Sequence, residues 1–539
     1  MTNTMMPTKY NKQYTHYPKN YQLRLPLELD ILIPEDANVR LLGQLLEELD
    51  YTELFKAYST RGRKFRISPR ILFKVIVFGY LENHYSSRSM TKACQRDIHF
   101  MWLLEGNDPP SHQLMNDFRK NRLTITILED LFYQFIEKLI EADEINLQYL
   151  FIDGTKIEAN ANRYTFQWRG TVEKQEATLL EKAKSLFVQF EKQLGFSCSF
   201  SEMDVLSSLE LAIHLMNQEK KATGMSFVYG KGKRKTPFQK LYEKANELYE
   251  RQSRYQLAHR LLNGRNSYSK TDPDATFMRM KEDHMKNGQL KPAYNVQIAV
   301  ESEYIIGIQH FNQTTDVNTL TPFLDYLAEK LGRRHSHIVA DAGYESEENY
   351  TYLETHHQLA YIKPLNYEQA KTKKYQQNPG KRENMIYDAT EDNYTCANHQ
   401  KLLNVGTHTK KNKKTGFESE VTTYQCHHCG ECPLRNHCTT AKEGKRIQVS
   451  KEFIRLREQS QQAVQTELGS CLRMNRSIQT EGTFGVLKED RQFRRFLMRG
   501  NKQVLTELLL LGIAFNIRKF HTRIQEDRIG KHLFKSEIE

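Results

Sequence analysis

The sequence Leu147-Gln-Tyr-Leu-Phe-Ile-Asp-Gly-Thr-Lys-Ile-Glu158 marks the point where helical periodicity gives way to a strand-like pattern. Tyr149–Ile152 is a short apolar, β-prone run that ends at Asp153 and Gly154. A carboxylate in this position sits on a rigid strand, and the glycine after it lets another group approach the backbone closely. These residues predict a buried strand that presents an aspartate at its end.

Further strands follow this one in a recognisable order. Residues 293–300 and 304–310 predict an antiparallel pair, 319–330 a helix, 337–341 a buried strand ending in Asp341, and 359–364 another strand. This order suits a mixed α/β sheet of the ribonuclease-H-like (RNase H-like) kind, with a helical insertion after the first strand.

The two aspartates are candidate metal ligands. A single aspartate at a strand end is usually a cap or turn residue, but adjacent strands would bring Asp153 and Asp341 to shared cations. Their hard oxygen ligands suit Mg²⁺ or Mn²⁺. Two such ions ~3.5–4 Å apart can activate an attacking hydroxyl and stabilise a leaving oxygen in phosphodiester displacement.

A third carboxylate is expected on the late helical segment, at Glu481. Gly482 and Gly485 leave the surface around it bare at a cost in helix propensity, which makes sense if metal and a nucleic-acid backbone approach there. Lys488 lies seven residues after Glu481, about two turns on, and is expected to share its face and hold a phosphate. A basic strip is expected to continue it, over Arg491, Arg494, Arg495 and Arg499. The alternative is a surface helix with ordinary charges.

The N-terminal region is helical in pattern. Val39–Asp50 predicts an amphipathic helix, Arg70–Leu81 a buried one, and Ser111 an N-cap for residues 113–122. The segment from Ser86 carries basic residues on a short helix, namely Arg88, Lys92 and Arg96. Short helices with basic surfaces fit a helix-turn-helix-like DNA reader, and an ordinary helical bundle fits equally well.

Residues 172–262 predict a long helical insert that is broken by a basic loop. Lys233, Arg234 and Lys235 in this loop are candidate phosphate contacts, although such runs are as often simply solvated. Before the insert, Tyr164, Phe166 and Trp168 alternate along the chain. Alternation favours a strand face in the core; stacking on an unpaired or flipped base is the functional alternative.

The eight cysteines are unevenly distributed. Cys94, Cys198 and Cys471 are isolated, whereas the other five gather at Cys396, Cys426, Cys429, Cys432 and Cys438. The Cys-x2-Cys spacing suits a tetrahedral structural Zn²⁺ held by four of these five thiolates. The alternative is a small insert of reduced, metal-free thiols.

Length and charge limit the class of protein. The chain has 539 residues, enough for two to four domains at ~100–200 residues each. It carries a formal net charge of +12, which favours a polyanionic partner such as nucleic acid without establishing one. No run of ~18 apolar residues exists and the N-terminus is polar, which argues against a membrane partner and a secretory signal and predicts a cytoplasmic protein.

The chain resembles the DDE-type transposases of bacterial insertion sequences. The resemblance rests on residues 152–159, Tyr294–Gln297, Val339–Tyr344 and Arg476–Lys488, and on the helical text from Ser68 to Arg122. It implies that Asp153, Asp341 and Glu481 form a triad that binds Mg²⁺ or Mn²⁺. Arg476 and Lys488 match the basic positions that flank the glutamate, although Arg476 lies one residue farther from it than is common in the family.

The resemblance implies an enzyme that binds terminal inverted repeats, cleaves phosphodiester bonds and joins the freed 3′-hydroxyls to target DNA. Double-stranded DNA would be its partner, in the bacterial nucleoid, with a homodimer in the synaptic complex. The alternatives are a catalytically inactive repressor or domesticated derivative, and a nuclease that does not transpose.

The expected fold is a mixed α/β, RNase H-like core preceded by an all-α domain. The expected divisions are a DNA-binding domain over 1–140, a first core segment over 145–365 with an insertion at 172–270, a Cys-rich insertion over 366–450 and helices completing the core over 451–539.

Overall fold

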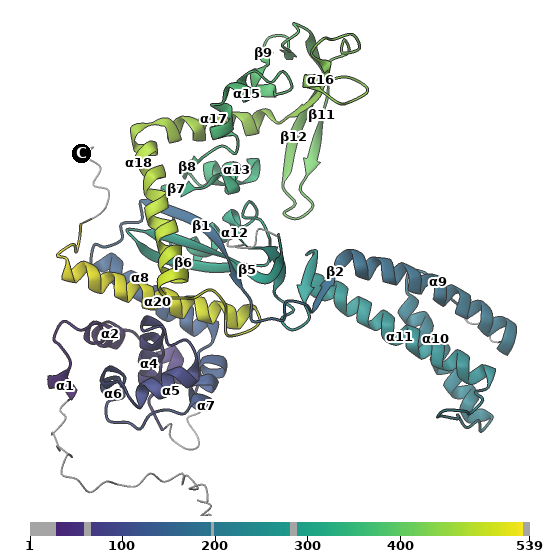
Figure 1. Cartoon of the computed structure of the whole chain (residues 1–539), viewed down its shortest axis with the longest axis horizontal. Coiled ribbons are helices and arrows are strands. Elements are labelled where there is room, and N and C mark those ends of the chain that lie inside the picture. The colour runs from purple at the N-terminus through teal and green to yellow at the C-terminus, as the bar shows by residue number, and fades with distance from the viewer. Residues whose placement is uncertain (1–28, 59–65, 196–198, 281–287, 532–539) are drawn as a thin grey trace, which may run out of the picture.

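The computed structural model describes residues 29–58, 66–195, 199–280 and 288–531 (Figure 1). Cys198 and both ends of the predicted divisions, residues 1–28 and 532–539, lie outside these ranges. Of the helices in the described ranges, none combines the length and the apolarity that a bilayer crossing requires.

A mixed sheet forms the centre of the molecule, in the order β4–β5–β1–β7–β8 with β6 also pairing with β5. Its strands are β1 (Tyr149–Glu158), β4 (Thr276–Arg279), β5 (Leu290–Glu301), β6 (Tyr304–Phe311), β7 (His337–Ala340) and β8 (Leu359–Ile362). β1 runs antiparallel to β5 and parallel to β7. Helices α12 (Leu320–Leu331) and α13 (Glu347–Thr355) connect the later strands. The mixed α/β prediction is confirmed.

The first strand is longer than its apolar run. The pattern predicted a strand ending at Asp153, but β1 continues to Glu158, so Asp153 lies in mid-strand and pairs with Ile298 of β5. The strand continues because antiparallel β5 runs alongside its whole second half. Pairing with β7, however, ends at Ile152 and Ala340.

The N-terminal region is helical, as expected. Its helices are α1 (Leu29–Leu32), α2 (Asn38–Glu47), α3 (Thr52–Lys56), α4 (Pro69–Leu81), α5 (Ser87–Cys94), α6 (Ile98–Leu103), α7 (His112–Asp117), the π-turn η1 (Phe118–Arg122) and α8 (Ile125–Glu141). The predicted cap is confirmed, because the Ser111 side chain accepts a hydrogen bond from the Leu114 N–H. α4 is buried along nearly its whole length, also as predicted.

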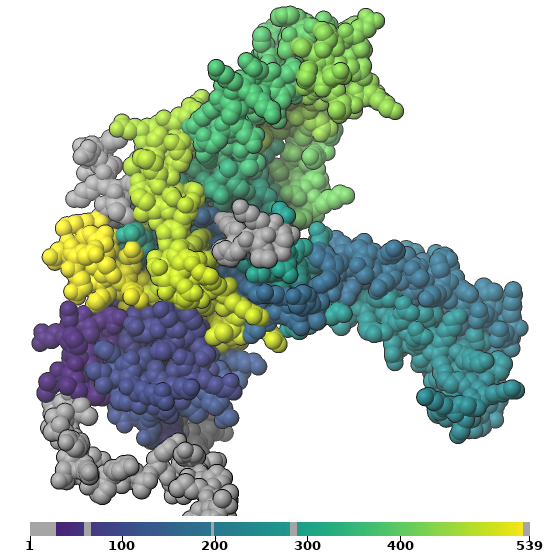
Figure 2. All heavy atoms as spheres, viewed as in Figure 1, coloured from purple at the N-terminus to yellow at the C-terminus, as the bar shows by residue number. Residues whose placement is uncertain are grey.

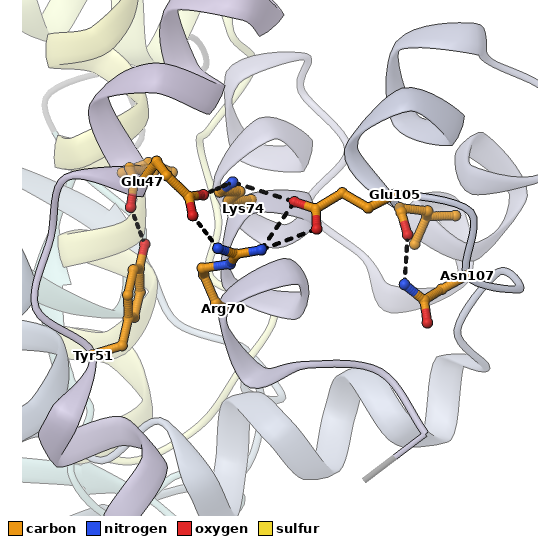
Figure 3. Close-up of polar contacts among 8 residues, drawn as sticks. Glu47, Tyr51, Arg70, Lys74, Glu105 and Asn107 are labelled. Carbon is orange, nitrogen blue, oxygen red and sulfur yellow. Dashed lines mark hydrogen bonds and ion pairs between the residues drawn. The ribbon is translucent and has the colours of Figure 1, made fainter. Parts of the chain in front are cut away.

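A polar network fixes α2 against α4 (Figure 3). Arg70 and Lys74 of α4 both contact Glu47 of α2 and reach Glu105 in the turn after α6, Arg70 at 3.0 Å and Lys74 at 3.5 Å. Lys74 is only 5% exposed, so its charge requires these two carboxylates. The network gives this part of the chain a defined packing in addition to its apolar contacts.

The helical insert forms an arm that projects from the body (Figures 1 and 2). It consists of α9 (Arg169–Leu194), α10 (Val205–Ala222) and α11 (Pro237–Leu262), with β2 (Phe166–Trp168) and β3 (Ser267–Ser269) paired at its base. The arm has its own hydrophobic cluster, drawn from all of these helices and separate from the main core. The loop with Lys233 and Arg234 lies between α10 and α11.

A second sheet occupies the cysteine-rich region, where the sequence pattern predicted no strands. Its order is β13–β12–β11–β10–β9, all antiparallel, with the short helix α16 (Arg435–Cys438) between β12 and β13. The strands are β9 (Ile386–Asp388), β10 (Asn393–Thr395), β11 (Lys401–Lys411), β12 (Glu418–Gln425) and β13 (Arg446–Val449). Short helices α14 (Tyr367–Ala370) and α15 (Lys373–Gln376) precede them.

The last helices return to the body. They are α17 (Lys451–Gln465), α18 (Glu467–Arg476), the π-turn η4 (Ser477–Glu481), α19 (Gly482–Gly485), the π-turn η5 (Val486–Asp490) and α20 (Asn501–Gln525). α17 and α18 pack on β8, and α20 packs on β6 and also on α4 and α8. One continuous hydrophobic core therefore joins the N-terminal helices to the central sheet.

Candidate active site

Asp153 of β1 and Asp341, which directly follows β7, lie at the same level of two neighbouring parallel strands. The last paired residues of β1 and β7 are Ile152 and Ala340, and each aspartate is the next residue along. Asp153 is 5% exposed, and its Oδ1 accepts a hydrogen bond from the Gly154 N–H at 2.8 Å. Asp341 caps the short helical turn that follows it, accepting from the Gly343 N–H at 2.7 Å. The sheet therefore brings the two predicted carboxylates side by side.

Arg476 joins Glu481 to the first of these carboxylates. Its guanidinium lies 3.5 Å from Asp153 Oδ2 and 3.1 Å from Glu481 Oε1. The Ser477 hydroxyl donates to the other oxygen of Glu481 at 2.7 Å. The glutamate, remote in sequence, thus lies within one guanidinium of Asp153.

The π-turn η4 explains the unusual spacing of Arg476. In an α-helix, residues five apart point about 140° away from each other. A π-turn hydrogen-bonds residue i to i+5 and so places such residues together. Because η4 covers Ser477–Glu481, it absorbs the extra residue and keeps Arg476 beside Glu481.

The oxygen donors suit a hard divalent cation, but the present arrangement does not bring three of them together. Among the described residues, no group of three His, Cys, Asp or Glu side chains is placed to hold a metal ion. Arg476 stands between two of the carboxylates and supplies positive charge there. The chemistry of the donors fits Mg²⁺ or Mn²⁺, and binding requires Glu481 to leave Arg476.

Sequence reasoning missed a further carboxylate, Asp316. Its Oδ1 accepts from Asn295 Nδ2 at 2.7 Å and from Gln297 Nε2 at 3.0 Å, both on β5. Gly154 makes room for this group, because a Cβ there would lie 2.3 Å from Gln297 Nε2 and 2.8 Å from Asp316 Oδ1. The expected close approach at Gly154 is therefore an approach by side chains of the same chain. The loop of Asp316 offered no strand or motif to single it out.

The pKa of the Tyr344 hydroxyl is affected by several nearby carboxylates. Its hydroxyl donates to Gln297 Oε1, and the residue is fully buried. Burial is the largest cause that raises the pKa of Tyr344 well above its usual value, and the charges of Asp316, Asp153 and Asp341 raise it further. The hydroxyl of Tyr344 therefore stays protonated next to the carboxylate region.

Lys488 does not lie on the exposed face that the helical spacing predicted. It is 6% exposed, and its Nζ donates to Thr155 Oγ1 at 2.7 Å, whereas the Glu481 side chain is 55% exposed. The π-turn η5 interrupts the helix at this point and changes the register. Thr155 lies two residues after Asp153 and shares its face of β1, so Lys488 still reaches the site from inside.

The predicted basic strip is only partly exposed. Arg491 is buried and donates to the carbonyls of Tyr80 and Leu81, so its place on a surface strip was wrong. Arg494 pairs with Glu489, and Arg495 contacts Glu158 and the Ala159 carbonyl; both remain exposed. The helix ends at η5, so Arg494 and Arg495 lie in an extended segment that runs beside the end of β1.

A basic cavity of about 250 Å³ adjoins Asp341. Lys363, Arg473 and Arg476 contribute to its lining, together with Asp341 itself and apolar residues of β7 and β8. Lys363 also pairs with Glu368, and Arg473 donates to the Tyr367 hydroxyl. The cavity offers positive charge next to the carboxylates, from two residues, Lys363 and Arg473, that sequence reasoning did not select.

The other predicted basic residues lie far from the carboxylates in the sequence. Arg88, Lys92 and Arg96 are exposed, and the last two line an open depression with His84 and His99. In the arm, Lys231, Lys233 and Arg234 are exposed, and Lys235 pairs with Glu243 at 2.5 Å.

The aromatic residues before the arm do not form a core face. Tyr164 is 79% exposed and Phe166 42% exposed, and Phe166 and Trp168 make edge and tilted contacts with Phe277. The core interpretation was wrong because β2 pairs only with short β3 outside the central sheet.

The clustered cysteines all line one small cavity of about 20 Å³. They are free thiols in this structure. Burial raises the pKa of the Cys426 thiol to about 11, and it also raises the pKa of Cys438.

Two known protein families match parts of the chain, one in its N-terminal region and one in its C-terminal region. Residues 395–521 match the family described as Transposase DDE domain, and residues 27–121 match the Transposase domain (DUF772). Both of these families are transposase families. No curated protein and no solved structure matches it.

The DDE match includes Glu481 and the clustered cysteines, whereas Asp153 and Asp341 lie in the unmatched stretch between the two matched regions. A DDE domain implies an RNase H-like core, which agrees with the mixed sheet and the N-terminal helices. A transposase domain implies DNA binding.

Proposed function

We propose that this protein is a metal-dependent DNA transposase that cleaves the ends of its element and joins the freed 3′-hydroxyls to target DNA. The observation that supports this best is the convergence of Asp153 and Asp341 on adjacent strands, with Arg476 holding Glu481 to Asp153. Asp153 and Asp341 follow paired positions of neighbouring strands, and Glu481 is linked to Asp153 through Arg476.

Asp153, Asp341 and Glu481 are the proposed ligands of Mg²⁺ or Mn²⁺, in two ions. When bound, such ions activate an attacking oxygen and stabilise the leaving oxygen of a phosphodiester. Lys363, Arg473 and Arg476 bind the phosphate in the cavity beside Asp341. Gly482 and Gly485 leave open space around Glu481, since a Cβ at either position would meet nothing within 4 Å.

The N-terminal helices and the arm are proposed to bind the DNA duplex. Lys92 of α5 and Arg96, which follows this helix, provide phosphate contacts at the depression beside α5, with Arg88 of α5 nearby in the sequence. Lys233 and Arg234 provide them in the arm loop, with Lys235 beside them, and Arg494 and Arg495 provide them along the end of β1. Lys488 fixes the Thr155 side chain of β1 through the hydrogen bond between Lys488 Nζ and Thr155 Oγ1. Work on two element ends calls for a homodimer, acting on DNA in the nucleoid.

The test is cleavage and joining of a duplex that carries the DNA flanking the gene. Asp341→Asn, with its geometry intact, should lose Mg²⁺-dependent cleavage by orders of magnitude, because positioning and charge neutralisation supply most of this catalysis. Binding of the end duplex should persist. The matched control is Glu210→Gln on exposed α10, which should cleave like the parent.

Retained Mg²⁺-dependent cleavage by Asp341→Asn would refute the assignment of the site. End binding by the parent protein without cleavage in Mg²⁺ or Mn²⁺ would favour the repressor. Hydrolysis without joining to a second duplex would favour the non-transposing nuclease.

A further inference from the structure

The five clustered cysteines approach one another from separate elements of the small sheet. Cys396 directly follows β10, and Cys426 directly follows β12. β11 pairs antiparallel with both strands, so β10 and β12 run in the same direction. Cys396 and Cys426 therefore lie at the same end of the sheet. Cys429, Cys432 and Cys438 belong to the loop and short helix that fold back over this end, and all five line the same cavity.

The turn Cys426–Cys429 is held in place by residues 444 and 445. The Cys426 N–H donates to the Lys445 carbonyl at 2.9 Å, and the Lys445 N–H donates to Cys429 Sγ at 3.3 Å. Gly444 has φ +94°, and a Cβ there would lie 2.6 Å from the Cys426 carbonyl oxygen. N–H donation to a sulfur stabilises its thiolate form, so the backbone here is already arranged for a ligand turn.

The small sheet has too little apolar material to hold itself together. Its hydrophobic cluster contains Met385, Tyr394, Leu402, Tyr424 and Val449 together with Cys426 and Cys429. β11 is exposed at nearly every position. Domains with so small a core usually depend on a disulfide or a metal.

We infer that this cavity binds one structural Zn²⁺ through Cys396, Cys426, Cys429 and either Cys432 or Cys438. A cavity of about 20 Å³ has room for a single ion between the thiols. A closed set of thiolates leaves no open position, so the role is structural.

The thiols must turn inward for this to happen. As placed, no three of the described cysteines and histidines could hold a metal. Cys438 directs its thiol to the Pro379 carbonyl at 3.5 Å, as a neutral S–H group does. Zinc binding releases these protons and frees each sulfur to rotate toward the ion.

The experiment measures metal in the full-length protein, purified from medium that contains both zinc and iron. We expect one zinc per chain by mass spectrometry, with Cys396→Ser, Cys426→Ser and Cys429→Ser each losing it and only one of Cys432→Ser and Cys438→Ser doing so. Cys471→Ser is the matched control and should keep its zinc, because Cys471 lies in α18 outside the cavity.

A variant that fails to fold does not block the test. In the parent protein, a thiol-modifying reagent should release one equivalent of zinc, and the zinc-free protein should unfold at a lower temperature until zinc is restored. Purification without zinc, full zinc in Cys429→Ser, or iron with inorganic sulfide would each overturn the inference. These outcomes are separate from DNA cleavage, so the proposed function stands or falls independently.

Discussion

Arg476 occupies the position between Asp153 and Glu481 that a bound cation would share. It contacts both carboxylates, and it lies on the wall of the basic cavity beside Asp341. The side chain can therefore act first as a counter-charge for the carboxylates and then as a partner for DNA phosphate.

Arg476→Ala should bind Mn²⁺ about fivefold more tightly than the parent, because the metal no longer has to break an ion pair of about 1 kcal/mol. Cleavage should nevertheless fall, since a phosphate contact is lost. The measurement is titration with Mn²⁺, following the free ion by electron paramagnetic resonance.

Arg455→Ala is the matched control. Arg455 pairs with Glu354 and Glu452 on the surface of α17, so its loss should leave Mn²⁺ binding unchanged. Weaker Mn²⁺ binding by Arg476→Ala would mean that the arginine positions Glu481 and does not compete with the metal.

At the scale of elements, the central sheet was predictable because its strands are apolar runs bounded by turns. Buried strands of this kind can be recognised in the sequence as apolar runs. Their order predicted that Asp153 and Asp341 lie on adjacent strands. The small sheet was not predictable, because β11 is exposed on both faces and shows no alternation. The π-turns at η4 and η5 were not predictable either, since one added residue changes the helix register without changing its composition.

The same limits applied to the candidate site. Asp153 and Asp341 lie on adjacent strands as predicted, and the assignment of Glu481 to the same metal site stays a prediction. Asp316, Lys363 and Arg473 come from loops and helices that only the folded chain brings together. Lys488 and Arg491 were assigned to a surface because helical spacing cannot reveal which face another domain covers.

The arm carries its basic loop away from the sheet at the end of long helices. α11 has 26 residues and therefore extends about 39 Å at 1.5 Å per residue. The hydrophobic cluster within the arm makes it a separate body that can bear substitutions on its loop.

Replacing Lys231, Lys233 and Arg234 together by glutamine should weaken DNA binding and reduce its dependence on salt. If all three side chains contact phosphates, the slope of log affinity against log salt should fall by about 3, at ~0.9 per contact. The measurement is binding of an end duplex over a range of salt concentrations.

The control replaces three exposed lysines on α9 by glutamine, namely Lys174, Lys182 and Lys192. It removes the same charge from the same arm. Equal slopes for the two triple variants would show that net charge, and not the loop, determines the affinity.

At the scale of the whole molecule, α20 packs against both the N-terminal helices and the central sheet. It is buried from Val504 to Ile517 and packs on β6, α4 and α8 at once. Glu507 lies inside this helix and accepts hydrogen bonds from the N–H groups of Leu497 and Met498. Burial raises the pKa of Glu507 to about 7.

The raised pKa of Glu507 makes stability depend on pH. The folded protein keeps this proton where the unfolded chain has released it, so the free energy of unfolding should fall as pH rises from about 4.5 to about 7. At 1.36 kcal/mol per pKa unit, the loss is on the order of 3 kcal/mol.

Glu507→Gln should therefore be more resistant to urea than the parent at pH 8 and similar to it at pH 5. Glu210→Gln, on the exposed surface of α10, should leave the pH dependence as it is in the parent. If Glu507→Gln kept the full loss of stability between pH 5 and pH 8, the buried carboxyl would not be its source.

The position of α20 also has a consequence during synthesis. The N-terminal helices and β6 both need this late helix as a packing partner, so neither can be completed before residues near Gln525 have left the ribosome. A nascent or prematurely terminated chain would lack a completed N-terminal helical region and a completed central sheet together. Nonsense and frameshift mutations upstream of α20 should therefore yield chains in which neither part reaches its packed state.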